Sequence, residues 1–533
     1  MSGPPQEFDY IVVGAGSSGC ALANRLSADA RYTVLLLEAG GPDTSPWIHI
    51  PIGYGKTIFD RRINWCYETE PEPELGGRRI YWPRGKVIGG SGAVNGLVYI
   101  RGQPEDYDNW AGLGNRGWGY EDMLPYFRRA EHQVRGGSAY HGADGPLWVS
   151  DLSERHPLCE AFIATANRRG VPLNADFNAE RQEGVGYFQL NTRRGVRCSP
   201  ATAYLRPARR RPNLAVVSHA LARRVLFRGR RAVGVEYQRN GEVRAARARR
   251  EVLLSAGAIN SPQLLMLSGI GELRQLARAG VEPIAELPGV GRNLQDHLQA
   301  RVVLRARQAI TYNDIFRSPL RTLWAGIQWV LTRSGPLTVS AGQAGAFVRL
   351  MPDAERPDVQ FHFITFSTDR PGEGLHRFPG FTMSVCQLRP ASHGRIELAS
   401  GDPSAAPRIF AQYLSARADL LVLRAAVRYA RELARTAPLA ELVAEEVSPG
   451  AADDDESIDE FIRATAVTIF HPVGTCKMGS GPEAVVDSAL RVRGVEALRV
   501  VDASIMPTLV SGNTNAAAIA IGEKGSDLVL GDA

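Results

Sequence analysis

The sequence predicts an α/β domain with a Rossmann-like parallel sheet, joined to a second α+β domain built on an antiparallel sheet. The first domain is predicted by an apolar run, residues 10–13, that enters a glycine-rich turn and then a helix. The second is predicted from residues 299–447, where strand-like runs such as DVQFHFITF alternate with helical stretches such as ADLLVLRAAVRYARELA. At 533 residues the chain is long enough for both domains.

The glycines of the first stretch, Gly14, Gly16 and Gly19, have the spacing G-x-G-x-x-G. Gly14 permits the sharp turn, Gly16 lets the backbone approach a pyrophosphate, and Gly19 lets the helix lie close to the sheet. A second apolar run, residues 32–37, ends at Glu38, about 20 residues past the glycines. A carboxylate there can accept hydrogen bonds from both hydroxyls of an adenosine ribose. This unit predicts a dinucleotide site and leaves FAD and NAD open.

The composition is ordinary for a globular enzyme, with 44% hydrophobic and 22% charged residues. No apolar run reaches the roughly 18 residues that a membrane span needs, although peripheral association with a membrane stays possible. The first ten residues have neither a basic start nor an apolar core, so we expect no secretory signal and a cytoplasmic protein.

The basic residues are almost all arginines, with clusters at residues 206–211, 223–231 and 244–250 in a chain of net charge +6. These clusters flank alternating strand-like runs without interleaved aromatic residues, as on a solvated β-hairpin, so no nucleic-acid partner is expected. The six cysteines and ten histidines show no metal-ligand spacing, so no metal site is predicted either.

Residues 41–83 lose periodicity and are rich in proline, glycine and aromatic residues. A loop of this length inside a compact protein is often a lid over a site, and Trp47 and Trp65 favour a packed lid. The next segment, YWPRGKVIGGSGAVNGLVYIRG (residues 81–102), contains glycines that imply a close approach of the backbone to a flat or charged group.

Several motifs together resemble those of the glucose-methanol-choline (GMC) oxidoreductases. GKVIGGSGAVNGLVY (residues 85–99) is similar to the first signature of that family, and GAINSPQLLMLSGIG (residues 257–271) is similar to the second. GVGRNLQDHL, HPVGTCKMG, LRVVDASIMP and SGNTNAAAIAIGE follow in the family's order. The resemblance covers nearly the whole chain. It implies the GMC fold, FAD rather than NAD as the cofactor, and the oxidation of an alcohol.

The resemblance also implies two catalytic residues. His471, in HPVGT, matches the family's catalytic histidine, and an imidazole titrates near neutral pH and can take the hydroxyl proton. Asn513, in SGNTN, matches the second active-site position of the family, which is His or Asn. Its amide can donate a hydrogen bond to the alkoxide as the proton leaves. The flavin N5 accepts the hydride.

The cofactor-binding residues follow from the same resemblance and from the glycine-rich unit. Thr514 and Asn515 begin a helix whose N-terminus is expected to point at the flavin. Val94 stands where relatives with covalently attached FAD can carry a histidine, so we predict non-covalent FAD. The predicted cofactor-binding residues are Gly14, Ala15, Gly16, Ser17, Ser18, Gly19, Glu38, Ala39, Trp65, Gly90, Ser91, Asn95, Gly96, Val98, Val225, Ala256, Asp502, Ala503, Thr514 and Asn515.

Both predicted domains are discontinuous in the sequence. Residues 1–155, 195–298 and 456–533 form the predicted FAD-binding domain, with residues 41–83 as its lid. Residues 156–194 and 299–455 form the predicted substrate-binding domain.

The composition of residues 299–352 favours a neutral, partly apolar primary alcohol over choline. A quaternary ammonium calls for an aromatic cage and usually a carboxylate, and Asp314 is the single acid in this stretch. The sequence is similar to the choline-dehydrogenase-like alcohol dehydrogenases of bacteria. The aromatic residues of the stretch are Tyr312, Phe316, Trp324, Trp329 and Phe347.

The predicted electron acceptor is a quinone or another carrier. An oxidase that uses O2 and makes H2O2, and a choline dehydrogenase, are the alternatives within the family. A non-redox enzyme of the hydroxynitrile lyase type is an alternative from another class, because a base and an asparagine also serve acid-base cleavage. A protein that only binds FAD would need neither His471 nor Asn513.

Overall fold

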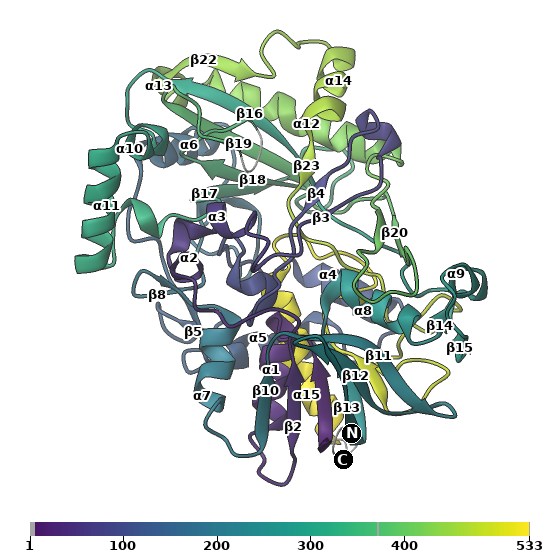
Figure 1. Cartoon of the computed structure of the whole chain (residues 1–533). Coiled ribbons are helices and arrows are strands. Elements are labelled where there is room, and N and C mark those ends of the chain that lie inside the picture. The colour runs from purple at the N-terminus through teal and green to yellow at the C-terminus, as the bar shows by residue number, and fades with distance from the viewer. Residues whose placement is uncertain (1–5, 370–372, 532–533) are drawn as a thin grey trace.

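Two large sheets form the framework of the structure, a computed structural model that describes residues 6–369 and 373–531. In Figure 1 the first sheet lies in the lower half and the second in the upper half, and both termini lie at the lower end of the first sheet. The segments that cross between the two sheets carry most of the residues discussed below.

The first sheet contains seven strands in the order β10-β2-β1-β13-β12-β11, with β24 paired to β13. Its central strands are parallel, and β11, β12 and β13 form an antiparallel meander. The centre of the sheet is buried on both faces, which explains the nearly continuous apolar runs of its strands. The bounds are β1 Gln6–Val13, β2 Val34–Leu37, β10 Leu214–Val217, β11 Ala220–Arg228, β12 Arg231–Arg239, β13 Glu242–Leu254 and β24 Leu498–Val500.

Helices α1 (Ser17–Leu26) and α15 (Asn515–Gly531) pack against each other beside this sheet. Glu523 of α15 is fully buried, and its carboxylate accepts hydrogen bonds from Arg25 of α1 at 2.8 Å and from Arg129 of α5 (Tyr120–Ala130) at 2.7 Å. A buried carboxylate is tolerated when it is paired and hydrogen-bonded. The three helices are therefore fixed relative to one another.

The second sheet contains seven strands in the order β22-β16-β19-β18-β17-β7, with β23 paired to β16, and all its pairs are antiparallel. Helix α12 (Arg417–Ala434) packs on β16 and β19. Figure 1 shows α12 above the sheet, so the opposite face is turned toward the first sheet. The bounds are β7 Gly184–Tyr187, β16 Leu298–Ala306, β17 Ala344–Val348, β18 Val359–Ile364, β19 Gly380–Gln387, β22 Val443–Ser448 and β23 Val467–Thr468.

The other helices and the short strands surround this framework. The further helices are α2 Pro46–His49, α3 Tyr54–Thr57, α4 Pro104–Gly112, α6 Pro157–Arg168, α7 Arg206–Ala208, α8 Gly257–Leu267, α9 Leu273–Arg278, α10 Tyr312–Phe316, α11 Pro319–Thr332, α13 Leu439–Leu442 and α14 Asp455–Thr465. The short strands are β3 Tyr67–Glu68, β4 Tyr81–Trp82, β5 Glu131–Gln133, β6 Leu147–Val149, β8 Thr192–Arg193, β9 Val196–Arg197, β14 Ile270–Gly271, β15 Ala285–Glu286, β20 Arg395–Glu397 and β21 Arg408–Phe410.

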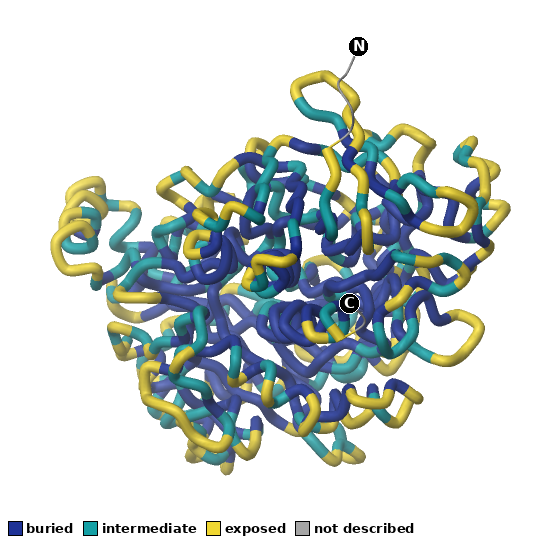
Figure 2. The backbone as a smooth tube through the Cα atoms, turned by 90° about the horizontal axis from the view of Figure 1, so that it is seen from below, coloured by how far each residue is buried: buried dark blue, intermediate teal, exposed yellow. Residues whose placement is uncertain are grey.

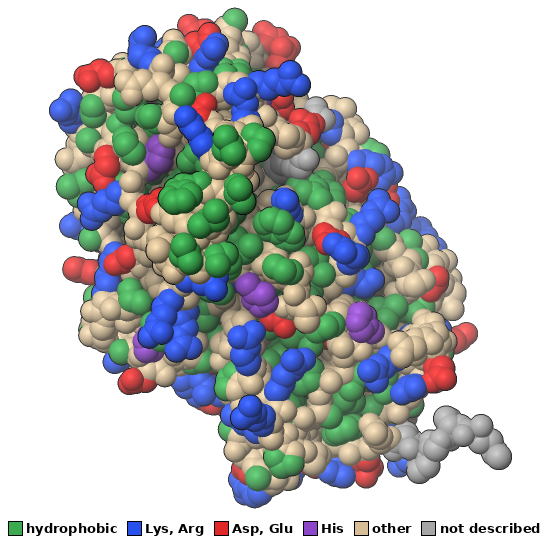
Figure 3. All heavy atoms as spheres, turned by 60° about the vertical axis from the view of Figure 1, so that its left-hand side comes forward, with side chains coloured by type: hydrophobic (Ala, Val, Ile, Leu, Met, Phe, Trp, Pro, Cys, Tyr) green, Lys and Arg blue, Asp and Glu red, His purple; other side chains and the backbone are tan. Residues whose placement is uncertain are grey.

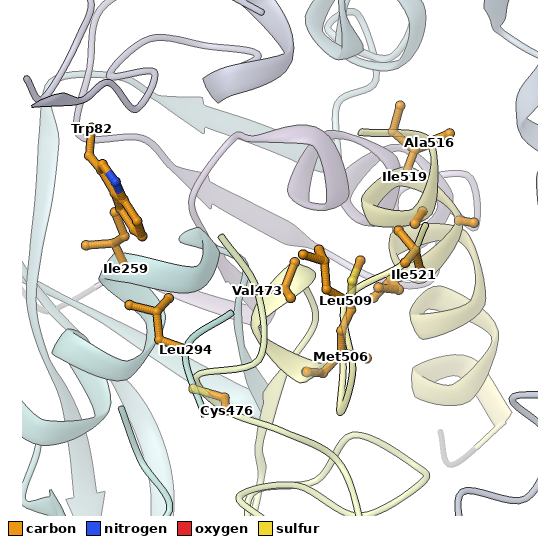
Figure 4. Packing of buried hydrophobic residues seen from close by; sticks show 14 of the residues in the cluster. Trp82, Ile259, Leu294, Val473, Cys476, Met506, Leu509, Ala516, Ile519 and Ile521 are labelled. Carbon is orange, nitrogen blue, oxygen red and sulfur yellow. The ribbon is translucent and has the colours of Figure 1, made fainter. Parts of the chain in front are cut away.

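The core extends through both sheets and the segments between them. Figure 2 shows buried backbone through the middle of the molecule and exposed backbone at its periphery. Figure 4 shows side chains of α8 (Ile259), of the segment 473–476 (Val473, Cys476) and of α15 (Ile519, Ile521) in one packed region. The segment that carries His471 is therefore anchored in the core.

The predicted fold class is confirmed: a Rossmann-like sheet is joined to an antiparallel sheet backed by helices. β7, from the segment 156–194 of the predicted substrate-binding domain, joins the second sheet. β23 joins the same sheet, although its segment, 456–533, belongs to the predicted FAD-binding domain. The limits of the two domains stay a prediction. Within the described ranges, no helix combines the length and the apolarity needed to cross a membrane.

Candidate active site

A cavity of about 830 Å³ extends from the β1-α1 turn to His471 and Asn513. Residues of both sheets and of the segment 41–83 line it. The predicted dinucleotide site and the predicted catalytic residues therefore share one continuous space.

The glycine turn between β1 and α1 forms one end of the cavity. Gly14 has φ +102°, and a Cβ on it would lie 2.5 Å from the carbonyl oxygen of Ser255. A Cβ on Gly19 would lie 1.9 Å from the carbonyl oxygen of Gly14, so the helix can approach the turn this closely only with glycine. By contrast, a Cβ on Gly16 would have no neighbour nearer than 3.8 Å. The free space at Gly16 faces the cavity, as the close approach of a pyrophosphate requires.

Glu38 follows β2 and lines the same end of the cavity. Its carboxylate accepts hydrogen bonds from the N–H of Ala15 at 2.9 Å and from the N–H of Gly40 at 2.8 Å. These bonds orient both oxygens and leave lone pairs for ribose hydroxyls. Burial raises the pKa of Glu38 to about 7.

These residues fit FAD. A glycine turn with free space, an oriented carboxylate and the N-terminus of α15 lie along one cavity that reaches His471. Val94, in the cavity wall, offers an apolar side chain and no group for a covalent bond. No cluster of three or more His, Cys, Asp or Glu side chains suited to a metal ion occurs among the residues that the structure describes.

The structure brings most of the predicted site residues to the cavity. Ala15 and Gly19 lie behind its wall, where they position Glu38 and α1. Val225 was expected near the adenosine but lies in β11, where its N–H donates to the hydroxyl of Ser268 at 2.8 Å. The strand reaches the cavity only with its first residues, 220–222. The predicted residues that line the cavity are Gly14, Gly16, Ser17, Ser18, Glu38, Ala39, Trp65, Gly90, Ser91, Asn95, Gly96, Val98, Ala256, His471, Asp502, Ala503, Asn513, Thr514 and Asn515.

His471 lies in the segment that follows β23. Asp296, just before β16, accepts hydrogen bonds from the N–H of His471 at 2.7 Å and from the hydroxyl of Thr468 at 2.5 Å. Phe470 has φ +71°, a sparsely populated conformation for a non-glycine residue. Its carbonyl oxygen accepts a hydrogen bond from Arg84 at 2.7 Å. These contacts fix the backbone beside the imidazole.

A chain of hydrogen bonds determines which nitrogen of His471 carries the proton. His297 Nε2 lies 2.9 Å from the carbonyl oxygen of Leu388, which can only accept, so this nitrogen is protonated. In the neutral ring, His297 Nδ1 is then an acceptor. It lies 3.1 Å from His471 Nδ1, which must therefore donate. His471 Nε2 is therefore unprotonated and is an acceptor.

Asn513 lies at this unprotonated nitrogen. Its Nδ2 donates a hydrogen bond to His471 Nε2 at 3.2 Å, and its Oδ1 accepts a hydrogen bond from Gln360 Nε2 at 3.2 Å. His362, two residues along β18, also lines the cavity, and a side-chain interaction with Asn513 opposes the effect of burial on its pKa. Three polar side chains, His471, Asn513 and His362, thus surround one point of the cavity.

All three histidines of this group are held in the neutral form. Burial lowers the pKa values of His297 and His362 to about 4. Burial is also the main cause that places the pKa of His471 well below its ordinary value, and His297, His362 and Arg84 lower it further. A neutral imidazole with an unprotonated Nε2 can act as a general base.

Sequence reasoning missed His297, His362, Gln360 and, apart from Trp65, the aromatic wall of the cavity. His297 stands in the GVGRNLQDHL motif, a signal that could have found it, whereas β18 carries no motif. Of the five aromatic residues in the stretch 299–352, Phe316 alone lines the cavity within the described chain, because Trp324 is exposed and Phe347 lies in the core. The other aromatic residues of the wall are Tyr54, Phe59, Trp65, Tyr67, Phe366 and Phe470.

Comparisons with known proteins agree with this geometry. The family model of the N-terminal part of the GMC oxidoreductases matches residues 8–299, and that of the C-terminal part matches residues 390–522. The chain is 45% identical to human mitochondrial choline dehydrogenase, over 98% of this chain and 90% of that protein. It is 42% identical to an alcohol dehydrogenase [acceptor] of Pseudomonas putida, over 98% of this chain and 96% of that protein.

Among solved structures, the pyridoxine 4-oxidase of Mesorbium loti is similar with a TM-score of 0.89 and 32% identity, over 97% of this chain and 98% of that chain. The family models cover well over half of the sequence, and the cavity has the features of an FAD site. This chain therefore belongs to the GMC oxidoreductases, which are FAD-dependent flavoproteins.

Proposed function

We propose that this protein oxidises a primary alcohol to the aldehyde, with His471 as the base and FAD as the hydride acceptor. The observation that carries the proposal is the hydrogen-bond chain from Leu388 through His297, which leaves His471 Nε2 unprotonated beside Asn513. The relatives are named for choline and for alcohols in general, and both names describe oxidation of a CH–OH group.

His471 and Asn513 have different roles toward the substrate hydroxyl. His471 Nε2 is unprotonated and takes the hydroxyl proton once the substrate hydroxyl replaces Asn513 as its hydrogen-bond partner. Asn513 Nδ2 then donates to the substrate oxygen, and its orientation is fixed by Gln360. Preorganised donors of this kind stabilise the charge that develops on the oxygen. FAD, when bound, supplies the acceptor for the hydride of the carbinol carbon.

Substitution His471→Ala is expected to leave FAD bound and to slow flavin reduction by roughly 10²- to 10⁴-fold, the usual contribution of a positioned base. Anaerobic stopped-flow absorbance with benzyl alcohol and aliphatic alcohols measures this rate. If the flavin of the variant is reduced at nearly the wild-type rate, His471 is not the base. No bleaching of the wild type by any alcohol would favour a lyase-type reaction.

The rate of flavin reduction is expected to be independent of pH above about 6.5. A base works in its deprotonated form, so the rate rises with pH up to the pKa of the base and is constant above it. Burial and the neighbouring imidazoles hold the pKa of His471 below 6.5. The rate constant measured from pH 5.5 to 9 tests this expectation. A rate that still rises tenfold per pH unit between 7 and 8.5 contradicts it.

FAD is expected to be released by acid precipitation, because Val94 offers no atom for a covalent bond to the flavin. The absorbance of the supernatant and of the pellet at the flavin maximum gives the two fractions. Flavin that stays with the precipitated protein after washing would show covalent attachment and refute the prediction.

We further propose a quinone of a membrane as the electron acceptor, reached through α11. This helix presents an apolar stripe to solvent, with Trp324 68% and Leu331 76% exposed. Arg317, Arg321 and Arg333 on and beside the helix are exposed as well. An amphipathic helix with aromatic and aliphatic side chains beside basic residues suits an anionic membrane surface. The apolar residues of the stripe are Leu320, Leu323, Trp324, Ile327, Val330 and Leu331.

The view in Figure 3 brings the side of the molecule that carries α11 forward, and hydrophobic side chains gather there with basic side chains nearby. Helix α10 directly precedes α11, and its Phe316 lines the main cavity. An apolar acceptor in the bilayer would therefore be close to the cavity wall. The predicted cytoplasmic location is compatible with this peripheral association.

The double substitution Leu323→Glu and Leu331→Glu is expected to reduce co-sedimentation with vesicles of phosphatidylcholine and phosphatidylglycerol at least tenfold, because two charges would enter the apolar phase. The same vesicles containing ubiquinone should reoxidise the reduced wild-type flavin faster than air-saturated buffer does. Leu173→Glu is the matched control, because Leu173 is 63% exposed but lies outside α11. Equal sedimentation of all three proteins would contradict the proposal.

A further inference from the structure

Arg301 of β16 lines the active-site cavity and has no hydrogen-bond or ion-pair partner among the described residues. Its guanidinium makes no hydrogen bond or ion pair with any residue that the structure describes, although the site is buried enough to lower its pKa to about 10. Arginine keeps its charge under such conditions. The exposed carboxylate of Asp369 acts on Arg301 electrostatically but forms no ion pair with it. A buried charge without a direct counter-charge is costly, and a ligand that supplies one would offset that cost.

Tyr54 of α3 is a second unpartnered polar group at the same place. Its hydroxyl is buried and has no hydrogen-bond partner within the described chain, and the residue lines the same cavity. The charge of Arg301 acts on the Tyr54 hydroxyl and opposes the effect of burial on its pKa. Buried polar atoms are nearly always hydrogen-bonded. Two orphaned groups from different segments, one cationic and one a donor, therefore indicate a ligand site.

The register of the second sheet places Arg301 at the reacting end of the cavity. Arg301 pairs with Ser384 on β19, and Ser384 pairs with His362 on β18. Directly paired residues point to the same face of a sheet, so Arg301 and His362 share the face that lines the cavity. Two strand spacings separate them by roughly 10 Å. His362 interacts with Asn513, which contacts His471. A small substrate could therefore reach from Arg301 to His471.

The charges around Arg301 favour an anion over a cation. Among the described residues of the cavity wall, the acidic side chains are Glu38, Asp502 and Glu373. Glu38 and Asp502 lie at the dinucleotide end and are hydrogen-bonded to their own surroundings. Glu373 is exposed and forms no ion pair with Arg301. Asp369, outside the cavity wall, acts on Arg301 electrostatically, but it is exposed and pairs with His376 at 2.9 Å. A quaternary ammonium at this position would face an unpaired arginine, and such like-charge contacts disfavour binding.

We propose that Arg301 and Tyr54 form a carboxylate-binding subsite, so that the substrate is a primary alcohol that carries a carboxylate several bonds from its hydroxyl group. The guanidinium can bind both carboxylate oxygens, and the tyrosine hydroxyl can donate to one of them. The inference rests on the proposed alcohol oxidation and names its substrate class. It also replaces the neutral alcohol expected from the composition of residues 299–352.

The test compares 4-(hydroxymethyl)benzoate with its methyl ester and with choline in the reductive half-reaction of the FAD-loaded protein. The free acid is expected to reduce the flavin with a kcat/KM at least tenfold above that of the ester, and choline with the lowest value. Arg301→Gln should lower kcat/KM for the acid by about 100-fold, as expected when one partner of a desolvated charge pair is removed. Its effect on the ester should stay below about threefold.

Two further variants isolate the subsite. Tyr54→Phe removes only the hydroxyl and should raise KM for the acid severalfold with little change in kcat. Arg305→Gln is the matched control, because Arg305 lies on the same strand but is exposed and pairs with Glu445 at 3.1 Å. It should leave all three substrates unaffected. Equal kcat/KM for acid and ester, or an equal loss for both in Arg301→Gln, would overturn the inference while alcohol oxidation stands.

Binding of 4-methylbenzoate, which cannot be oxidised, separates this inference from the proposed function. Its dissociation constant is measured from the perturbation of the flavin spectrum. Binding by the wild type that weakens at least tenfold in Arg301→Gln supports the subsite even if no alcohol bleaches the flavin. Absence of binding, or unchanged affinity in Arg301→Gln, overturns it.

Discussion

The close contact of backbone with backbone at the β1-α1 turn is the constraint on which the site depends. A Cβ on Gly19 would collide with the carbonyl of Gly14, and a Cβ on Gly522 of α15 would lie 2.5 Å from the carbonyl oxygen of Ser18. Two glycines thus let α1 rest on the turn and α15 rest on α1. The start of α15 is thereby fixed beside the cavity, and Asn513 lies two residues before it. The contact that shapes the predicted phosphate-binding turn therefore also positions the predicted catalytic residue Asn513.

Buried carboxylates connect the remaining segments to this arrangement. Asp502 accepts hydrogen bonds from the N–H of Gly257 at 2.8 Å and the hydroxyl of Ser261 at 2.5 Å, and also from the N–H of Ser504 at 2.8 Å. It joins the start of α8 to the segment after β24. Asp296 joins β16 to the His471 segment in the same way. Each carboxylate is satisfied by several donors, as burial of a charge requires, so these segments have little freedom to shift.

The low polarity of the interior determines how the histidines behave. Three imidazoles within one buried group cannot all carry charge, because each protonated ring would raise the energy of the next. The tautomers of the neutral rings are then set by their hydrogen bonds. The carbonyl oxygen of Leu388 fixes the proton on His297 Nε2 and so the direction of donation along the hydrogen-bond chain. The same desolvation lowers the pKa of Arg301, which keeps its charge nonetheless. The cavity therefore holds neutral imidazoles around His471 and a charged guanidinium at Arg301.

Much of this architecture can be predicted from local sequence. The spacing of Gly14, Gly16 and Gly19 specifies a turn whose geometry depends only on residues near in the chain, and Glu38 follows from the length of one βαβ step. The signature segments identify the GMC oxidoreductases, and with them FAD, His471 and Asn513, because these motifs are contiguous. The change of pattern after residue 299 indicates a second sheet. Each of these predictions uses information within a few tens of residues.

The tertiary structure alone decided the rest. The pairing of β16 with β19 and of β19 with β18 brings Arg301 and His362 to one face, and α3 adds Tyr54 from a segment with no regular pattern. The tautomer of His471 depends on His297 and Leu388, which are far from it in sequence. The sequence by itself determined the family and the cofactor and predicted the two catalytic positions, because short motifs encode local geometry. The shape and charge of the substrate end came from the fold, because strand register and burial are properties of contacts between distant segments.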